Sequence, residues 1–76
     1  MSSLDNVKKL EVGTPFVECC GFSVFRFVCK TKPVRSETGQ WSWIGTYVHD
    51  ELREGQECEF LITEGFEHYG PKIYLD

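Results

Sequence analysis

The stretch from Trp41 to Leu75 constrains the fold of this chain most, because it divides into three short strand-like segments with a turn signal at each joint. Aromatic and β-branched residues fill the first segment, apolar and polar residues alternate from Cys58 to Thr63, and a short apolar run ends the chain. Gly55 and the Gly- and Pro-containing segment 65–71 separate these runs, since Gly and Pro permit backbone angles that strands do not use. A 76-residue chain can bury such strands only by wrapping them into a small closed sheet.

The preceding half of the chain adds two further strands. The clearest is Phe22 to Lys30, in which apolar side chains alternate between two faces, and Phe16 to Cys19 forms another. Residues 31–40 are polar and contain Pro and Gly, which predicts a loop. Residues 7–12 fit either a short strand or a single helical turn, and residues 1–6 are expected to be a loose tail.

The sequence therefore predicts an all-β fold with little or no helix: one small five-stranded antiparallel barrel over residues 7–76. Hydrophobic residues make up 41% and aromatic residues 14% of the chain, enough to build a core and to exclude a disordered protein. No apolar run is long enough to span a membrane, and the N-terminus lacks the apolar stretch of a signal peptide. We expect a cytoplasmic protein.

The four cysteines do not predict a disulfide framework or a metal site. Cys19 and Cys20 are adjacent, and no C-x-x-C pair is present. Cys29 and Cys58 are expected to be small core residues, since free cysteine is often buried. No cofactor is predicted, and the sequence leaves open whether Cys19 and Cys20 have a redox role.

Charge is unevenly distributed along the chain, whose net charge is −4. Residues 26–35 contain four cations and no acid, whereas residues 50–67 contain seven carboxylates and one arginine. This asymmetry predicts a basic loop and an acidic face, either of which could meet a partner.

Several short segments resemble the cold-shock domain, a five-stranded oligonucleotide-binding (OB-fold) barrel. Tyr47-Val48-His49 is similar to the aromatic–Val–His core of that family's second RNA-binding motif, and Gly21-Phe22 lies where the first motif would fall. Leu52-x-Glu54-Gly55-Gln56 and Gly70-Pro71-Lys72 resemble two of its turns. Cys20 and Val24 depart from the family pattern, which has lysine and an aromatic residue there. The resemblance implies an oligonucleotide-binding barrel.

The first functional hypothesis is a protein that binds single-stranded RNA or DNA, because bases stack on aromatic rings set in a groove of positive charge. The candidate stacking residues are Phe22, Trp41, Trp43, Tyr47 and His49, and the candidate phosphate contacts are Lys30, Lys32 and Arg35. The alternative that Phe22 and Trp43 belong to the core stays open.

The second hypothesis is a small acidic protein-interaction or inhibitor module, comparable in size and charge to acidic inhibitory proteins of phage. Its binding face would comprise Asp50, Glu51, Glu54, Glu57 and Glu59. The alternative is that these carboxylates only keep a small aromatic-rich barrel soluble. An edge strand from Val7 to Phe16 would offer a second copy of the chain a pairing partner.

An enzyme is not predicted. His49 and His68 lie far apart in the sequence, and their acidic neighbours point to opposite faces if they lie on strands. No spacing favours a cysteine–histidine nucleophile pair or a metal site.

Overall fold

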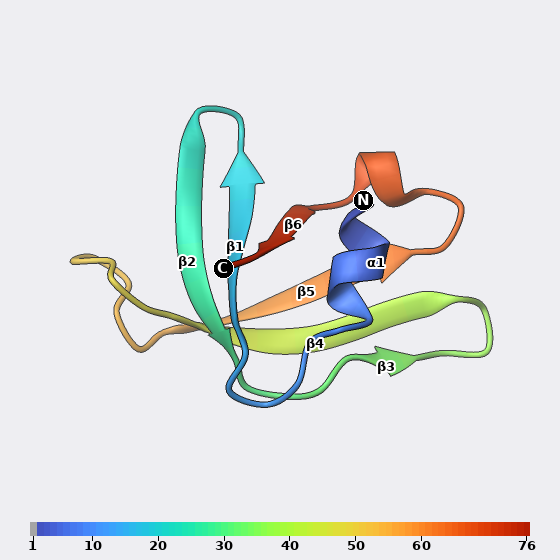
Figure 1. The fold of residues 1–76 in the computed structure, drawn as a ribbon, viewed down its shortest axis with the longest axis horizontal. Coiled ribbons are helices and arrows are strands. Elements are labelled where there is room, and N and C mark those ends of the chain that lie inside the picture. The colour runs from blue at the N-terminus through green and yellow to red at the C-terminus, as the bar shows by residue number, and fades with distance from the viewer. Residues whose placement is uncertain (1) are drawn as a thin grey trace.

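The strand β4 joins the two halves of the sheet in the computed structural model, which describes residues 2–76 (Figure 1). In chain order the elements are α1 (Ser3–Val7), β1 (Pro15–Cys20), β2 (Ser23–Cys29), β3 (Val34–Arg35), β4 (Gln40–Tyr47), β5 (Glu57–Thr63), the 3-10 helix η1 (Glu67–Tyr69) and β6 (Lys72–Leu75). One edge of β4 pairs with β5, and the other pairs with β3 and then with β2. β1 follows β2, and β6 follows β1.

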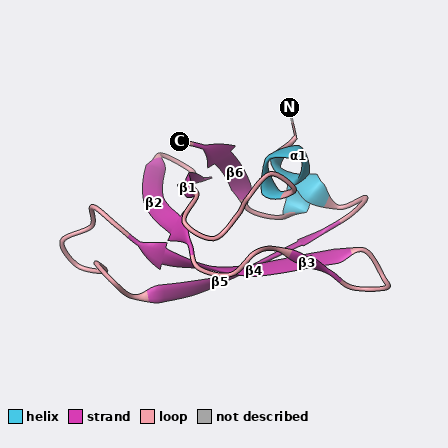
Figure 2. Cartoon of the chain, turned by 60° about the horizontal axis from the view of Figure 1, so that its bottom comes forward, coloured by secondary structure: helices cyan, strands magenta, loops and turns pink. Residues whose placement is uncertain are grey.

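All of these strand pairings are antiparallel, so the predicted all-β antiparallel class is confirmed. The two-residue strand β3 is an addition, since it lies within the segment predicted as a loop. The sheet curls into a half-barrel, in which β6, β1 and β2 fold over β4 and β5 (Figure 2). Within residues 2–76, β5 and β6 are not paired with each other, so the barrel does not close and both strands keep an outer edge.

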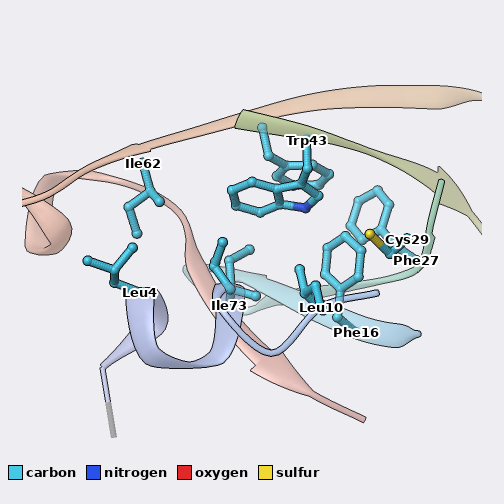
Figure 3. Close-up of a cluster of buried hydrophobic side chains, with 10 residues drawn as sticks. Leu4, Leu10, Phe16, Phe27, Cys29, Trp43, Ile62 and Ile73 are labelled. Atoms are coloured by element: carbon cyan, nitrogen blue, oxygen red, sulfur yellow. The ribbon is translucent and has the colours of Figure 1, made fainter. Parts of the chain in front are cut away.

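An aromatic cluster fills the space between the two halves of the sheet (Figure 3). The rings of Phe16 and Phe27 stack with centroids 5.2 Å apart, and those of Trp43 and Phe60 stack at 5.1 Å. Gly45 makes this packing possible, because a Cβ there would lie 2.7 Å from Cζ of Phe16. Large rings give a short chain much buried apolar area per residue, which offsets its small size.

The prediction of a loose tail over residues 1–6 is wrong from Ser3 onward. Met1 lies outside the described residues. Ser3 to Val7 form the helix α1, whose first turn is capped by the Ser2 hydroxyl accepting from the Asp5 N–H at 3.2 Å. Leu4 and Val7 are buried in the core. A five-residue helix is not stable alone, so these tertiary contacts hold it in place.

Helix α1 also covers the outer edge of β6. The Ile73 N–H donates to the Ser3 hydroxyl at 2.9 Å, and the Asn6 side-chain amide donates to the Ile73 carbonyl at 2.9 Å. The two side chains thus supply one donor and one acceptor where a neighbouring strand would supply them. Asn6 is the one buried polar residue among the described residues, and this contact accounts for its burial.

The prediction of an edge strand from Val7 to Phe16 is also wrong. Residues 8–14 form turns rather than a strand, and Leu10 is buried. β1 begins at Pro15 and has β2 on one side and β6 on the other. This segment therefore offers no free edge to a second copy of the chain.

Replacing Asn6 with alanine is expected to lower the free energy of unfolding by about 1–3 kcal/mol, because it leaves the buried Ile73 carbonyl without a partner. Urea unfolding at neutral pH measures this change. Asp5→Ala, at an exposed position of the same helix, is the control and should cost less than about 0.5 kcal/mol. Equal changes in the two variants would show that the Asn6 contact does not hold α1 on the sheet.

Candidate functional site

The rings predicted to stack on bases do not share one surface. Trp43 is only 2% exposed and packs in the aromatic cluster, so the alternative of a core residue holds for it. Tyr47 is half-buried and faces the interior, with its ring 4.5 Å from that of Phe27. Phe22 is fully exposed at the turn between β1 and β2, which excludes the core alternative for that residue. His49 is exposed in the β4–β5 loop, with a positive φ of 58°.

Trp41 is half-buried, and its indole is held by neighbouring side chains. The Trp41 Nε1–H donates to the Glu64 carboxylate at 2.7 Å, and the Lys8 ammonium lies 5.8 Å from the ring centroid. Trp41 therefore has a defined orientation at the end of β4 near α1. A base could stack only on the part of the ring that Lys8 leaves open.

The three cations predicted to contact phosphate are each paired with a carboxylate of the same chain. Lys30 pairs with Glu57, Lys32 with Glu11 at 3.4 Å, and Arg35 with Glu64 at 2.8 Å. The predicted basic loop is therefore largely neutralised where it stands, and a phosphate would have to displace these carboxylates.

Glu64 is the acceptor at the centre of the strongest of these contacts. Hydrogen bonds from Arg35 and from the Trp41 indole hold the pKa of the Glu64 carboxyl at about 2. The same carboxylate raises the pKa of the Arg35 guanidinium. Glu64 thus ties β3, β4 and the end of β5 together through side chains.

The predicted acidic residues divide into two groups. Asp50 shapes the β4–β5 loop, since its carboxylate accepts from the Leu52 and Arg53 N–H groups, both at 3.0 Å, and pairs with the Arg53 side chain. Glu54 accepts from the Asp50 N–H, and Glu57 pairs with Lys30. Glu51 and Glu59 are exposed and form no ion pair within residues 2–76.

Two open grooves border β5. The larger, about 560 Å³, lies where β3, β4 and β5 run side by side, and its lining includes Val34, Ser42, Ile44, Glu59 and Leu61. The smaller, about 370 Å³, lies between β5 and the segment before β6, and its lining includes Glu18, Cys58, Glu59, Tyr69 and Pro71. The segment from Glu59 to Leu61 borders both grooves. No single sequence motif marks them, because their walls come from distant parts of the chain.

The titratable groups in and beside the smaller groove have raised pKa values. Burial raises the pKa of the Cys58 thiol and of the Glu18 carboxyl, and it also raises the pKa of the Tyr47 hydroxyl. A raised pKa keeps a thiol protonated, whereas nucleophilic cysteines need a lowered one. Cys29 is buried, as predicted, while Cys58 is half-buried; all four cysteines are free thiols. Among residues 2–76 no group of three potential ligands could hold a metal ion.

Comparison with known proteins gives no relative: no family model, no curated protein and no solved structure matches this chain. None of the helices in residues 2–76 is both long and apolar enough to cross a membrane.

Glu64→Gln is expected to destabilise the protein at neutral pH and to remove part of its acid sensitivity. A carboxyl whose pKa falls to about 2 on folding contributes stability above its unfolded value of 4.5, and that contribution is lost as the pH falls from about 5 to 2. Wild type and variant should therefore differ in urea midpoint at pH 7 and converge near pH 2.

Glu37→Gln is the matched control, because Glu37 is an exposed carboxylate of the neighbouring turn and forms no ion pair within residues 2–76. Its urea midpoint should follow that of the wild type at every pH. A Glu64→Gln variant that keeps the full difference at pH 2 would contradict the assignment.

Proposed function

We propose that this protein is a small protein-interaction module that binds a partner bearing basic and apolar side chains through β5 and the adjoining β4–β5 loop. The observation that supports this best is the pairing of charges. Most of the lysine and arginine side chains form ion pairs within the chain, while Glu59 on β5 and Glu51 in the β4–β5 loop are exposed and form none within residues 2–76.

Five of the eight lysine and arginine side chains form ion pairs within the chain. Seven of the twelve side-chain carboxylates form none within residues 2–76: Asp5, Glu18, Glu37, Glu51, Glu54, Glu59 and Glu67. Nucleic acid binding depends on cations that neutralise phosphates and release counterions. The charge that remains after ion pairing is negative, which favours a basic protein as the partner.

Apolar side chains lie beside these carboxylates on the surface. Leu52 at the tip of the β4–β5 loop is 80% exposed, Val34 is 66% exposed and Leu61 is 52% exposed. Val34 and Leu61 line the larger groove together with Glu59. An apolar patch bordered by charge is typical of a protein-binding surface, since burial supplies affinity and the charges supply specificity. The free cysteines are compatible with the reducing cytoplasm as the place where the module acts.

Reversal of two unpaired carboxylates tests this proposal. Glu51→Lys with Glu59→Lys should abolish capture of partner proteins from an extract of the cells that make this protein, since both side chains are exposed and neither supports the fold through an ion pair. Glu57 is unsuitable, because its reversal would also break the pair with Lys30. Affinity capture followed by mass spectrometry is the measurement.

The matched control is Glu37→Lys with Glu67→Lys, which changes net charge equally but involves neither groove. It should capture the same proteins as the wild type. Equal loss in both double variants would indicate a non-specific charge effect, and equal retention would overturn the proposal.

A second candidate function is binding of single-stranded nucleic acid by a cold-shock-like barrel. The fully exposed ring of Phe22 favours it, because an apolar ring at a turn tip buries nothing within the chain. It ranks second because Phe22 and Trp41 lie on separate elements and the predicted cations are paired.

Tryptophan fluorescence tests the second candidate, since Trp41 is half-exposed whereas Trp43 is buried. Titration with short RNA and DNA at about 50 and 200 mM salt should give no saturable quenching if the module binds protein. Saturable quenching that weakens with salt, together with a loss of about 1–3 kcal/mol of binding in Trp41→Ala, would favour nucleic acid instead.

A further inference from the structure

The two strand edges of the half-barrel differ in how their backbone groups are satisfied. At β6, hydrogen bonds with Ser3 and Asn6 satisfy the outward N–H and C=O of Ile73. β5 pairs with β4 on one side only. Within residues 2–76 no strand pairs with its other side, where the Cys58 thiol makes a long contact of 3.7 Å to the Glu59 carbonyl. The β5 edge is therefore open to an added strand.

The register identifies which groups of β5 face this open edge. At one end of the β4–β5 ladder the Tyr47 N–H donates to the Gln56 carbonyl, and at the other the Glu64 N–H donates to the Gly39 carbonyl. In an antiparallel pair every second residue bonds to the same neighbour, so the even-numbered residues between these ends bond to β4. The N–H and C=O groups of Glu59 and Leu61 consequently point away from the sheet.

The smaller groove lies directly beside these groups. Glu59 and Leu61 form one wall, and the segment from Tyr69 to Pro71 forms the other. Near Ile62 the two walls approach closely, since a Cβ on Gly70 would lie 3.3 Å from Cγ1 of Ile62. Away from that contact, the groove follows β5 over residues 58–61, a length of about 13 Å at the rise of an extended strand.

We propose that this groove receives an extended segment of the partner protein, which pairs as an added strand with the open edge of β5 and places a lysine or arginine side chain against Glu18. The proposal rests on the proposed function, because it names the chemistry of the partner at the same strand. Addition of a strand to an exposed edge gives affinity through main-chain hydrogen bonds and specificity through alternate side chains.

Glu18 supplies the specificity. It lies on β1 between Phe25 of β2 and Ile73 of β6, half-buried, and forms no ion pair within residues 2–76. The neighbouring strands partly bury its carboxylate, and this burial raises its pKa. A cation that enters the groove would stabilise the charged form of Glu18, which burial destabilises. An acidic segment would be repelled by the same carboxylate.

A second copy of this chain fits the open edge poorly. Two β5 edges paired with each other would bring together the Glu59 carboxylates of both copies, which form no ion pair within residues 2–76, and like charges on adjacent strands are destabilising. A segment in which lysines alternate with apolar residues fits better, since its lysines can share the inner face with Glu18 while its apolar residues lie on the outer face with Leu61.

The test uses the full chain and a defined probe, the capped peptide Thr-Lys-Val-Lys-Val-Lys-Thr. NMR spectra of the 15N-labelled protein should show saturable shifts of the Glu59 and Leu61 amides, and hydrogen exchange of these two amides should slow by about tenfold or more when the peptide is bound. A peptide with glutamate in place of each lysine, and a lysine peptide N-methylated at both valines, should not bind.

Two protein variants assign the contacts. Glu18→Gln keeps the size of the side chain and should weaken binding of the lysine peptide about tenfold. Leu61→Pro removes an outward N–H that β4 does not use and should abolish binding, with Leu61→Val as the control that retains the N–H. If Leu61→Pro does not fold, the N-methylated peptide still tests the backbone pairing.

The remaining outcomes separate this proposal from the proposed function. Peptide binding without slower exchange at Glu59 and Leu61, or no peptide binding while partner capture still depends on Glu51 and Glu59, would overturn strand addition and leave the interaction module intact. Protection of the same amides that rises with protein concentration and needs no peptide would identify a second copy as the occupant and overturn the proposal. Capture that the Glu51→Lys, Glu59→Lys variant retains in full would overturn the proposed function itself.

Discussion

A curled sheet that does not close must satisfy the backbone groups along its two edges, and the rest of this structure depends on how it does so. At β6 the chain uses its own first helix: Ser3 and Asn6 provide the donor and acceptor that Ile73 requires. The same helix buries Leu4 and Val7 over the opening of the half-barrel. One short segment therefore completes both the hydrogen bonding and the core, which explains why a helix occurs in an otherwise all-β chain.

The core imposes a second requirement, because four large rings must fit between the two halves of a very short sheet. Phe16 occupies the space that a side chain at position 45 would fill, so a glycine on the central strand is needed for the halves to approach. The Trp43 indole is buried even though its Nε1–H finds no hydrogen-bond partner within residues 2–76, a cost of about 1–3 kcal/mol. The stacking of Trp43 on Phe60 and the area that it buries offset that cost.

Much of this architecture could be predicted from the sequence, and the failures have physical causes. Alternation and turn residues predicted the long strands, because side-chain period and backbone freedom are local properties. Helix α1 was missed because its residues become helical only through contacts with Ile73, about 70 positions away. A local signal was available in Ser2 and Asp5, whose spacing suits a helix N-terminus.

The candidate site was harder to predict than the fold, because its properties depend on pairing across strands. Lys30, Lys32 and Arg35 form a basic cluster in the sequence, but their partners come from distant segments at positions 57, 11 and 64. Alternation alone also could not decide whether Trp43 faces the core or solvent. Of the predicted acidic residues, Glu51, Glu54 and Glu59 are exposed and form no ion pair within residues 2–76.

The carboxylates of β5 bear on how an open strand edge avoids unwanted pairing. An exposed edge invites pairing with any extended chain, and natural proteins protect such edges with charge. Here Glu59 lies on the open strand and forms no ion pair within residues 2–76, so its charge disfavours pairing with a second copy or another acidic chain. A basic segment is attracted instead, because its positive charge is opposite to that of the carboxylate. Under the proposed function, the same residues both protect the edge and select the partner, because specificity also arises from a penalty against unwanted partners.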